Sequence, residues 1–189
     1  MTGGSNLSAS AKLDFSVIIP RVLFLQVGTG TTSPYSDNLA VDSIAFSVPT
    51  GSIGTGSMSG TGGDLTNGAV TVRVLGNGGD VGLTNSVNGP LGSGNALNPT
   101  TVAWSDISVT SAALASGTPG FSPTAITHPT FNTAVTGGSS AAVALPAASG
   151  VVRREGSWTF AYANNKVLPA GTYGTAANNG RVTYTASMP

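Results

Sequence analysis

The chain has 189 residues, including 27 glycines, 11 prolines, no cysteine and one histidine. Charged residues make up 7% of it, against about 25% in an average soluble domain, and the formal net charge is zero. Seven scattered cations cannot neutralise a nucleic-acid backbone or hold a chain on an acidic membrane surface. No apolar run approaches the length of a membrane span. We therefore expect no nucleic-acid partner, no membrane span, and a β-rich chain of ordinary domain size.

The composition also bears on folding and on compartment. Hydrophobic residues make up 40% of the chain, whereas disordered segments combine low hydrophobicity with high net charge. The first residues lack the basic region and apolar core of a signal peptide. Few charges with abundant Gly, Ser, Thr and Asn are typical of secreted bacterial surface proteins. We expect a folded, exported protein at the bacterial cell surface, whose leader is absent from this sequence.

The first predicted element is a long strand over residues 7–19. Its apolar residues occupy every odd position: Leu7, Ala9, Ala11, Leu13, Phe15, Val17 and Ile19. The even positions are polar or charged except Ile18, so the pattern predicts one buried and one exposed face. Such a strand would extend about 43 Å at about 3.3 Å per residue, whereas typical strands have about 3–10 residues. Pro20 ends it, and a more fully buried strand is predicted over 22–27.

Short strands separated by glycine-rich turns are predicted downstream. Apolar residues alternate over 44–48, 102–109 (with a break at Ser105 and Asp106), 158–162 and 182–186. Residues 69–87 predict a β-hairpin with the loop 76–80. Loops are expected over 51–68, 89–99 and 134–150, and Pro146 interrupts the best helical candidate, 141–148.

These segments predict an all-β fold. Eight or nine short strands in one chain indicate a single antiparallel β-sandwich. We divide the chain into an arm with the first strands, residues 1–27, and a sandwich body, residues 28–189.

The sequence carries no motif of catalysis, so we expect a protein that is not an enzyme and has no cofactor. No serine has the nucleophile-elbow spacing, and the glycine-rich phosphate-binding patterns are absent. His128 is interpreted as a loop residue held before Pro129. Calcium ligands are conceivable at Asp80 or at 37–38, but these are ordinary turn residues, and we expect no metal site.

Two aromatic residues and one charged cluster need an interpretation. Trp104 and Trp158 would suit a sugar-stacking platform, but their alternating apolar neighbours favour core packing. The cluster Arg153-Arg154-Glu155 is interpreted as a solvated turn before the strand of Trp158.

Both ends of the chain resemble bacterial fimbrial subunits. The segment 7–19 resembles their donor-strand extension, and 156–162, 169–174 and 180–185 resemble the final strands of secreted pilin-like sandwiches. The resemblance implies an immunoglobulin-like sandwich that lacks one strand, which the extension of a neighbouring subunit supplies. It implies assembly residues Leu7, Ala9, Ala11, Leu13, Phe15, Val17 and Ile19. Met188 stands where many such pilins carry tyrosine, and the disulfide of many of them is absent.

We therefore expect a structural subunit of an extracellular bacterial filament or pilus, serving surface adhesion or biofilm. Its partner would be a second copy, because strand addition gives affinity through main-chain bonds and a contact that does not close generates a filament. Three alternatives stay open. The N-terminal strand could pair within its own chain. The protein could be a secreted carbohydrate-binding module for a host or surface glycan, or a virion capsid or decoration protein.

Overall fold

The structure is a computed structural model that describes residues 4, 7–31, 35, 40–97, 99–115 and 117–189. Its strands are β1 (Leu23–Val27), β2 (Ile44–Ala45), β3 (Met58–Ser59), β4 (Thr61–Gly62), β5 (Ala69–Gly76), β6 (Val81–Val87), β7 (Leu91–Gly92), β8 (Thr101–Val102), β9 (Ile107–Ala113), β10 (Ser122–Pro123), β11 (Gly138–Ser139), β12 (Val143–Leu145), β13 (Val152–Tyr162) and β14 (Thr183–Ser187). Three short 3-10 helices are described: η1 (Thr50–Ser52), η2 (Trp104–Asp106) and η3 (Ala176–Asn178). Within these residues no helix is long and apolar enough to cross a membrane. The prediction of an all-β chain is confirmed.

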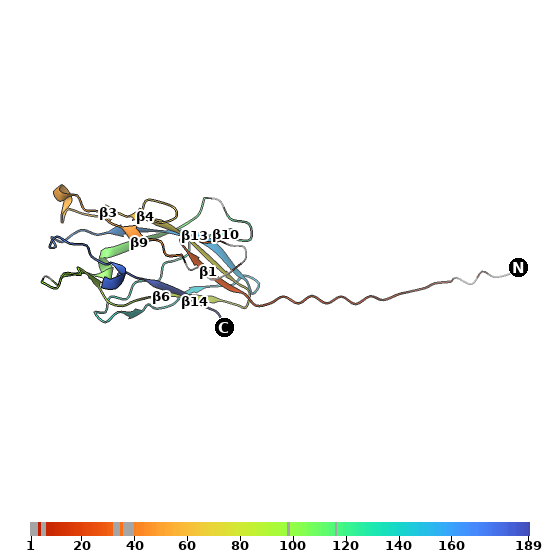
Figure 1. The fold of residues 1–189 in the computed structure, drawn as a ribbon. Helices are drawn as coiled ribbons and strands as arrows, with labels where there is room; N and C mark the ends of the chain where they lie inside the picture. The colour runs from red at the N-terminus through yellow and green to blue at the C-terminus, as the bar shows by residue number, and fades with distance from the viewer. Residues whose placement is uncertain (1–3, 5–6, 32–34, 36–39, 98, 116) are drawn as a thin grey trace.

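The larger sheet is built around β13, the longest strand (Figure 1). β13 pairs antiparallel with β5 on one side and with β9 on the other, and β1 pairs with the far side of β5. Beyond Ala69, the first residue of β5, β13 pairs instead with β3. The strands β2 and β4 form a separate antiparallel pair. β10 runs parallel to the start of β13, which corrects the expectation that every strand pair is antiparallel.

The smaller sheet is built around β6. β14 pairs with one side of β6, and β11 and β12 pair with the other, all antiparallel. A further pair, β7–β8, stands apart from both sheets. The larger and the smaller sheet face each other. Between them, the buried apolar side chains of β5 pack against those of β6.

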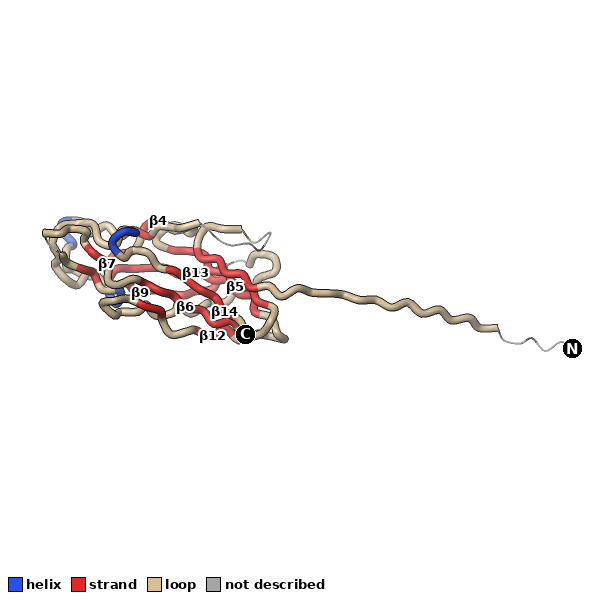
Figure 2. The backbone as a smooth tube through the Cα atoms, turned by 60° about the horizontal axis from the view of Figure 1, so that its bottom comes forward, coloured by secondary structure: helices blue, strands red, loops and turns tan. Residues whose placement is uncertain are grey.

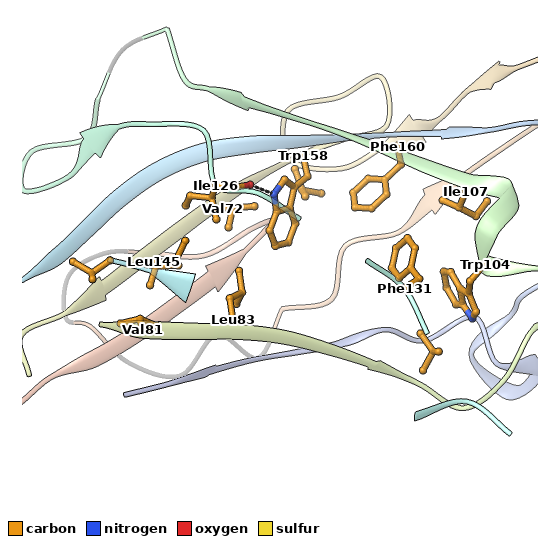
Figure 3. Close-up of a cluster of buried hydrophobic side chains, with 14 residues drawn as sticks. Val72, Val81, Leu83, Trp104, Ile107, Ile126, Phe131, Leu145, Trp158 and Phe160 are labelled. Carbon is orange, nitrogen blue, oxygen red and sulfur yellow. Dashed lines mark hydrogen bonds between the residues drawn. The ribbon is translucent and has the colours of Figure 1, made fainter. Parts of the chain in front are cut away.

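The core between the sheets is apolar and closely packed (Figure 3). Trp158 of β13 is fully buried, and its indole Nε1 donates to the carbonyl of Ile126 at 2.6 Å. Ile126 belongs to residues 124–131, which connect the two sheets. At one end Thr124 N–H donates to the Glu155 carbonyl, and at the other the carbonyl of Pro129 accepts from Asn85 of β6. This crossing segment, 124–131, therefore closes the side of the core next to β9.

The expectation of a hairpin over 69–87 is wrong. Both strands form, but β5 lies in the larger sheet and β6 in the smaller one, so residues 77–80 carry the chain from one sheet to the other. The would-be Cβ of Gly76 lies 2.8 Å from a Val81 methyl group, because the two strands turn their apolar sides toward each other. A glycine-rich loop between two strands with alternating apolar residues permits either a hairpin within one sheet or a connection between two facing sheets.

Other expectations also need correction. The expected loop 51–68 contains β3 and β4, the loop 89–99 contains β7, and the loop 134–150 contains β11 and β12. The helical candidate 141–148 forms the strand β12, which pairs with β6. Glu155 lies inside β13 and is fully buried, so the Arg153-Arg154-Glu155 cluster is no solvated turn. The predicted break at Ser105 and Asp106 is confirmed, since η2 occupies it.

The N-terminal segment also departs from its prediction. Residues 7–19 form no strand within the described chain, and both faces of the segment are exposed to solvent. A strand needs a hydrogen-bonded neighbour, and this segment has none among the described residues. The chain first enters a sheet at β1, which pairs with β5 along its full length.

Candidate functional site

The most conspicuous feature of the molecule is an arm, residues 7–19, that projects away from the body (Figures 1 and 2). Its large odd-numbered side chains are almost fully exposed: Leu7 96%, Leu13 76%, Phe15 86%, Val17 83% and Ile19 77%. Large exposed apolar surfaces are a common feature of sites of interaction. All seven assembly residues that the sequence predicts therefore lie together on one exposed, unpaired segment.

The root of the arm, residues 20–22, is fixed to the body. Asn77 holds it from both sides, because its Nδ2 donates to the carbonyl of Pro20 at 2.8 Å and its Oδ1 accepts from Val22 N–H at 2.7 Å. Arg21 donates to the terminal carbonyl of Pro189, just beyond β14. These contacts direct the arm away from its own sheets. We call this end of the body the root end and the opposite one the far end.

One edge of the larger sheet is incompletely covered. At the root end this edge is β1, where Leu25 and Val27 are half-buried against the core and Leu23 is 40% exposed. Phe24 and Gln26, on the opposite face of the same strand, are 3% and 1% exposed. Core-facing side chains are normally the better buried ones, so the described residues cover the inner face of β1 only in part.

Residues 42–48 continue this edge toward the far end. Ile44 and Phe46 pack partly against the core, and the ring of Phe46 lies 6.2 Å from that of Tyr162 at the end of β13. Val48 is half-buried in the same alternation, while the residues between them are exposed. The edge thus carries a row of half-buried apolar side chains along both of its segments.

The facing edge of the smaller sheet shows the same deficit. β14 pairs with β6, and no strand among the described residues pairs with its other side. Its core-facing side chains are only half-buried: Val182, Tyr184, Ala186 and Met188. On β6, by contrast, Val81, Leu83 and Val87 are at most 3% exposed. Among the described residues β14 is therefore an edge strand, with one side of its main chain facing no strand and its apolar row only partly covered.

The two edges approach each other across the core. β1 and β14 are in contact, and Gly78 N–H lies 3.1 Å from the sulfur of Met188 at the root end. We call β1, residues 42–48 and β14 together the open edge. An added strand with apolar side chains on one face would bond to β14 and cover both rows.

Tyr184 is fixed from the inside. Its hydroxyl lies 2.8 Å from Nε2 of His128 on the crossing segment, and its ring lies 5.0 Å from that of Trp158. His128 is enclosed by aromatic rings, and this burial lowers the pKa of His128 to about 4. Burial also raises the pKa of Tyr184. His128 is thus a neutral core residue that positions β14, rather than a simple loop residue before Pro129.

A depression lies on the other side of the core, beside β9. Its volume is about 390 Å3, and its lining includes Trp104, Ile107, Val109, His128 and Phe131. Trp104 is 6% exposed and donates its Nε1 to the carbonyl of Gly89 at 2.8 Å. Trp158 is fully buried, so neither tryptophan presents a ring face to solvent. The expectation of core packing is confirmed for both residues.

Of the two places considered for calcium ligands, the structure describes only Asp80. Asp80 accepts a hydrogen bond from Ala147 N–H at 2.8 Å, as a turn residue does. The pair 37–38 lies outside the described residues. In the part of the chain that the structure describes, no group of three or more His, Cys, Asp or Glu could hold a metal ion. The absence of enzymatic activity stays a prediction.

Comparisons with protein-family models, curated proteins and solved structures give no match for this chain. The functional argument therefore depends on the arm and on the open edge. Sequence reasoning found the arm but missed the open edge. Alternation in 44–48 and 182–186 indicated strands there, yet alternation is the same in central and edge strands, so it does not reveal which rows stay uncovered.

Proposed function

We propose that this protein is a structural subunit of an extracellular bacterial filament or pilus, serving surface adhesion or biofilm formation. Its body acts as a single immunoglobulin-like β-sandwich that lacks one strand, and residues 7–19 of one copy supply that strand to the open edge of the next. The observation that carries the proposal is the exposed apolar row of the arm, which no other described residue of its own chain covers.

The chemistry of the two surfaces matches. The odd-numbered face of the arm brings five large apolar side chains, and burial of each contributes about 1.5–3 kcal/mol. The open edge offers apolar rows that are half-buried and main-chain groups of β14 that await a partner. The period of two on the arm matches the pleat of a strand, so all five side chains enter the core together.

The root contacts explain why the acceptor is a second copy. Asn77 and Arg21 fix residues 20–22 so that the arm leaves the body, and Pro20 lacks the N–H that a tight return turn would use. A copy that gives its arm to one neighbour and receives an arm from another makes a heterologous contact. Such contacts generate open filaments when the rotation does not close.

The direction of the incoming arm follows from the same geometry. The acceptor's own arm leaves at the root end, beside the end of β14. An incoming arm with its root at that end would place two bodies against each other there. With its root at the far end it runs antiparallel to β14, and the bodies then follow one another head to tail. The low charge, 7%, suits surfaces that are covered in such a polymer.

Electron microscopy of the purified protein tests the proposal. The full chain should form fibres, and a variant lacking residues 1–19 should form none, because the body then has no strand to donate. Fibres from the truncated variant, or monomers from both proteins at high concentration, would contradict strand donation as the mode of assembly.

A further inference from the structure

Ile18 breaks the pattern of the arm. It is the one large apolar residue on the even-numbered face, among Ser8, Ser10, Lys12, Asp14 and Ser16, and it is 90% exposed. When the odd-numbered face lies against the core of an acceptor, Ile18 points outward, away from both apolar rows. Its side chain is then uncovered unless another part of the acceptor meets it.

The far end of the body carries a small apolar surface, which we call the tip: Ile53 of the loop 50–56 and Val167 of the loop 163–168. Ile53 is 44% exposed and Val167 is 79% exposed. A methyl group of Val167 lies 3.2 Å from the would-be Cβ of Gly54, so the two loops touch. The tip lies at the end opposite the arm, where the orange coil of η1 is seen (Figure 1).

The tip is rigidly built. Asn164 is 2% exposed, and its Nδ2 donates to the carbonyls of Ser52 at 2.6 Å and Gly56 at 3.0 Å. Its Oδ1 accepts from Gly54 N–H at 3.2 Å, which closes the loop 50–56 around it. Exposed apolar side chains on a preorganised support lose little entropy when a partner covers them.

The second loop is fixed as well. Lys166, next to Val167, places its Nζ 3.0 Å from a carboxylate oxygen of Asp106 in η2. Ile53 therefore has a held residue on each side, and Val167 has one in Lys166.

The open edge leads directly to the tip. Residues 42–48 continue along that edge to η1, and β13 ends at Tyr162, two residues before Asn164. An arm that runs antiparallel to β14 has its last residues at this far end. Ile18 and the tip are thus brought to the same place, one from each copy.

We infer that Ile18 of one copy packs on Ile53 and Val167 of the next copy. The inference rests on the proposed function and adds a second contact to strand donation, between the base of the arm and the far end of the acceptor. Strand addition alone leaves the angle between successive bodies to the short junction between the bound arm and its root, residues 20–22. Coverage of Ile18 by the tip fixes the angle between successive bodies and stiffens the filament.

Cysteine pairs test the contact, since the natural chain has no cysteine to confuse the result. A chain with Ile18→Cys and Val167→Cys should give, after mild oxidation of filaments, a ladder of covalent oligomers that collapses on reduction. Ile18→Cys with Ile53→Cys is the second pair. The matched control is Lys12→Cys with Val167→Cys, since Lys12 lies on the same face about 20 Å along the arm and should give no ladder.

The outcomes separate the two claims. A ladder from either Ile18 pair and none from the control supports the contact. Filaments that show no ladder from both Ile18 pairs, or an equal ladder from the control, overturn the contact while strand donation stands. If the unmodified chain forms no filament at all, the proposed function fails and the contact fails with it. Val167→Asp should leave filaments assembled, but they should bend more strongly under the microscope because they are less stiff. Filaments with unchanged curvature would count against the contact.

Discussion

Arg73 and Glu155 face each other across β5 and β13 on the outer surface of the larger sheet, where they form an ion pair. The Glu155 side chain is fully buried, and the Arg73 side chain is 17% exposed. Arg73 also donates to Gln26 of β1 at 3.0 Å and to the hydroxyl of Thr118 at 2.9 Å. One buried pair thus ties the edge strand β1 and the loop before β10 to the centre of the sheet.

Removal of one member of this pair should be costly. Glu155→Ala leaves the guanidinium of Arg73 without its counter-ion, and we expect the free energy of unfolding to fall by about 3 kcal/mol. The double variant Arg73→Met with Glu155→Leu should recover much of that loss, because it removes both charges. Urea unfolding monitored by tryptophan fluorescence measures both. A loss below about 1 kcal/mol for Glu155→Ala would show that the pair contributes no more than an exposed one.

Stability should decline as the pH falls through the range set by His128. The unfolded chain binds a proton on histidine near the usual pKa of about 6.5, whereas the folded protein binds it only near pH 4. The stability due to neutral His128 is thus complete above pH 6.5 and is lost as the pH falls toward 4, by about 3 kcal/mol.

Glu155 should make stability decline further at the acidic end of this pH range and below it. Burial alone would raise the pKa of Glu155, but hydrogen bonds from Thr118 and Arg73 and the Arg73 charge outweigh it, so its pKa lies below the usual value. Its contribution is lost as the pH falls below about 4.3. Urea unfolding at pH 7, 5.5 and 4 measures the slope. His128→Gln should flatten the slope between pH 6.5 and 4, and an unchanged slope would assign it to other groups.

Asn164 should hold the loop 50–56 in its folded conformation. Its backbone φ is 44°, which Ala tolerates poorly, and its side chain makes three of the loop's hydrogen bonds. Asn164→Ala should lower the free energy of unfolding by about 2 kcal/mol and open the loop to proteolysis. Asn95→Ala, in an exposed loop, is the control and should change stability by less than about 0.5 kcal/mol. Equal protease resistance of the two variants would contradict the assigned role.

The two faces of the arm should respond differently to charge. Phe15→Asp places a carboxylate on the face that enters the acceptor core, so it should abolish or greatly slow assembly. Ser16→Asp adds the same charge one residue away on the opposite face and should leave fibres intact. Turbidity and microscopy on matched samples compare them. Equal inhibition by both would indicate that charge, rather than burial of the odd-numbered face, governs assembly.

Local pattern predicted much of the body. The alternation around Trp158 and around Tyr184 predicted β13 and β14, because a half-buried strand imposes a period of two on its own residues. The alternation of apolar residues does not predict which other strand a strand pairs with. The predicted hairpin over 69–87 failed for that reason, since β5 and β6 face each other from two sheets instead of pairing within one.

The remaining errors concern contacts between residues distant in sequence. Glu155 follows two arginines, and its true partner, Arg73, lies 82 positions away, so the local charge cluster was misleading. His128 enters an aromatic core only because the crossing segment passes between the sheets. On the arm the sequence predicted the alternation correctly, but residues 7–19 pair with no strand among the described residues.

The most direct test of strand donation uses the arm as a separate peptide. A peptide with the sequence of residues 7–19 should bind a variant that lacks residues 1–19 and raise its thermal unfolding midpoint as peptide concentration increases. At one hundred times its dissociation constant the peptide would add about 2.7 kcal/mol of stability. A peptide of the same composition with the alternation scrambled is the control and should do nothing. No shift, or the same shift with both peptides, would contradict the account.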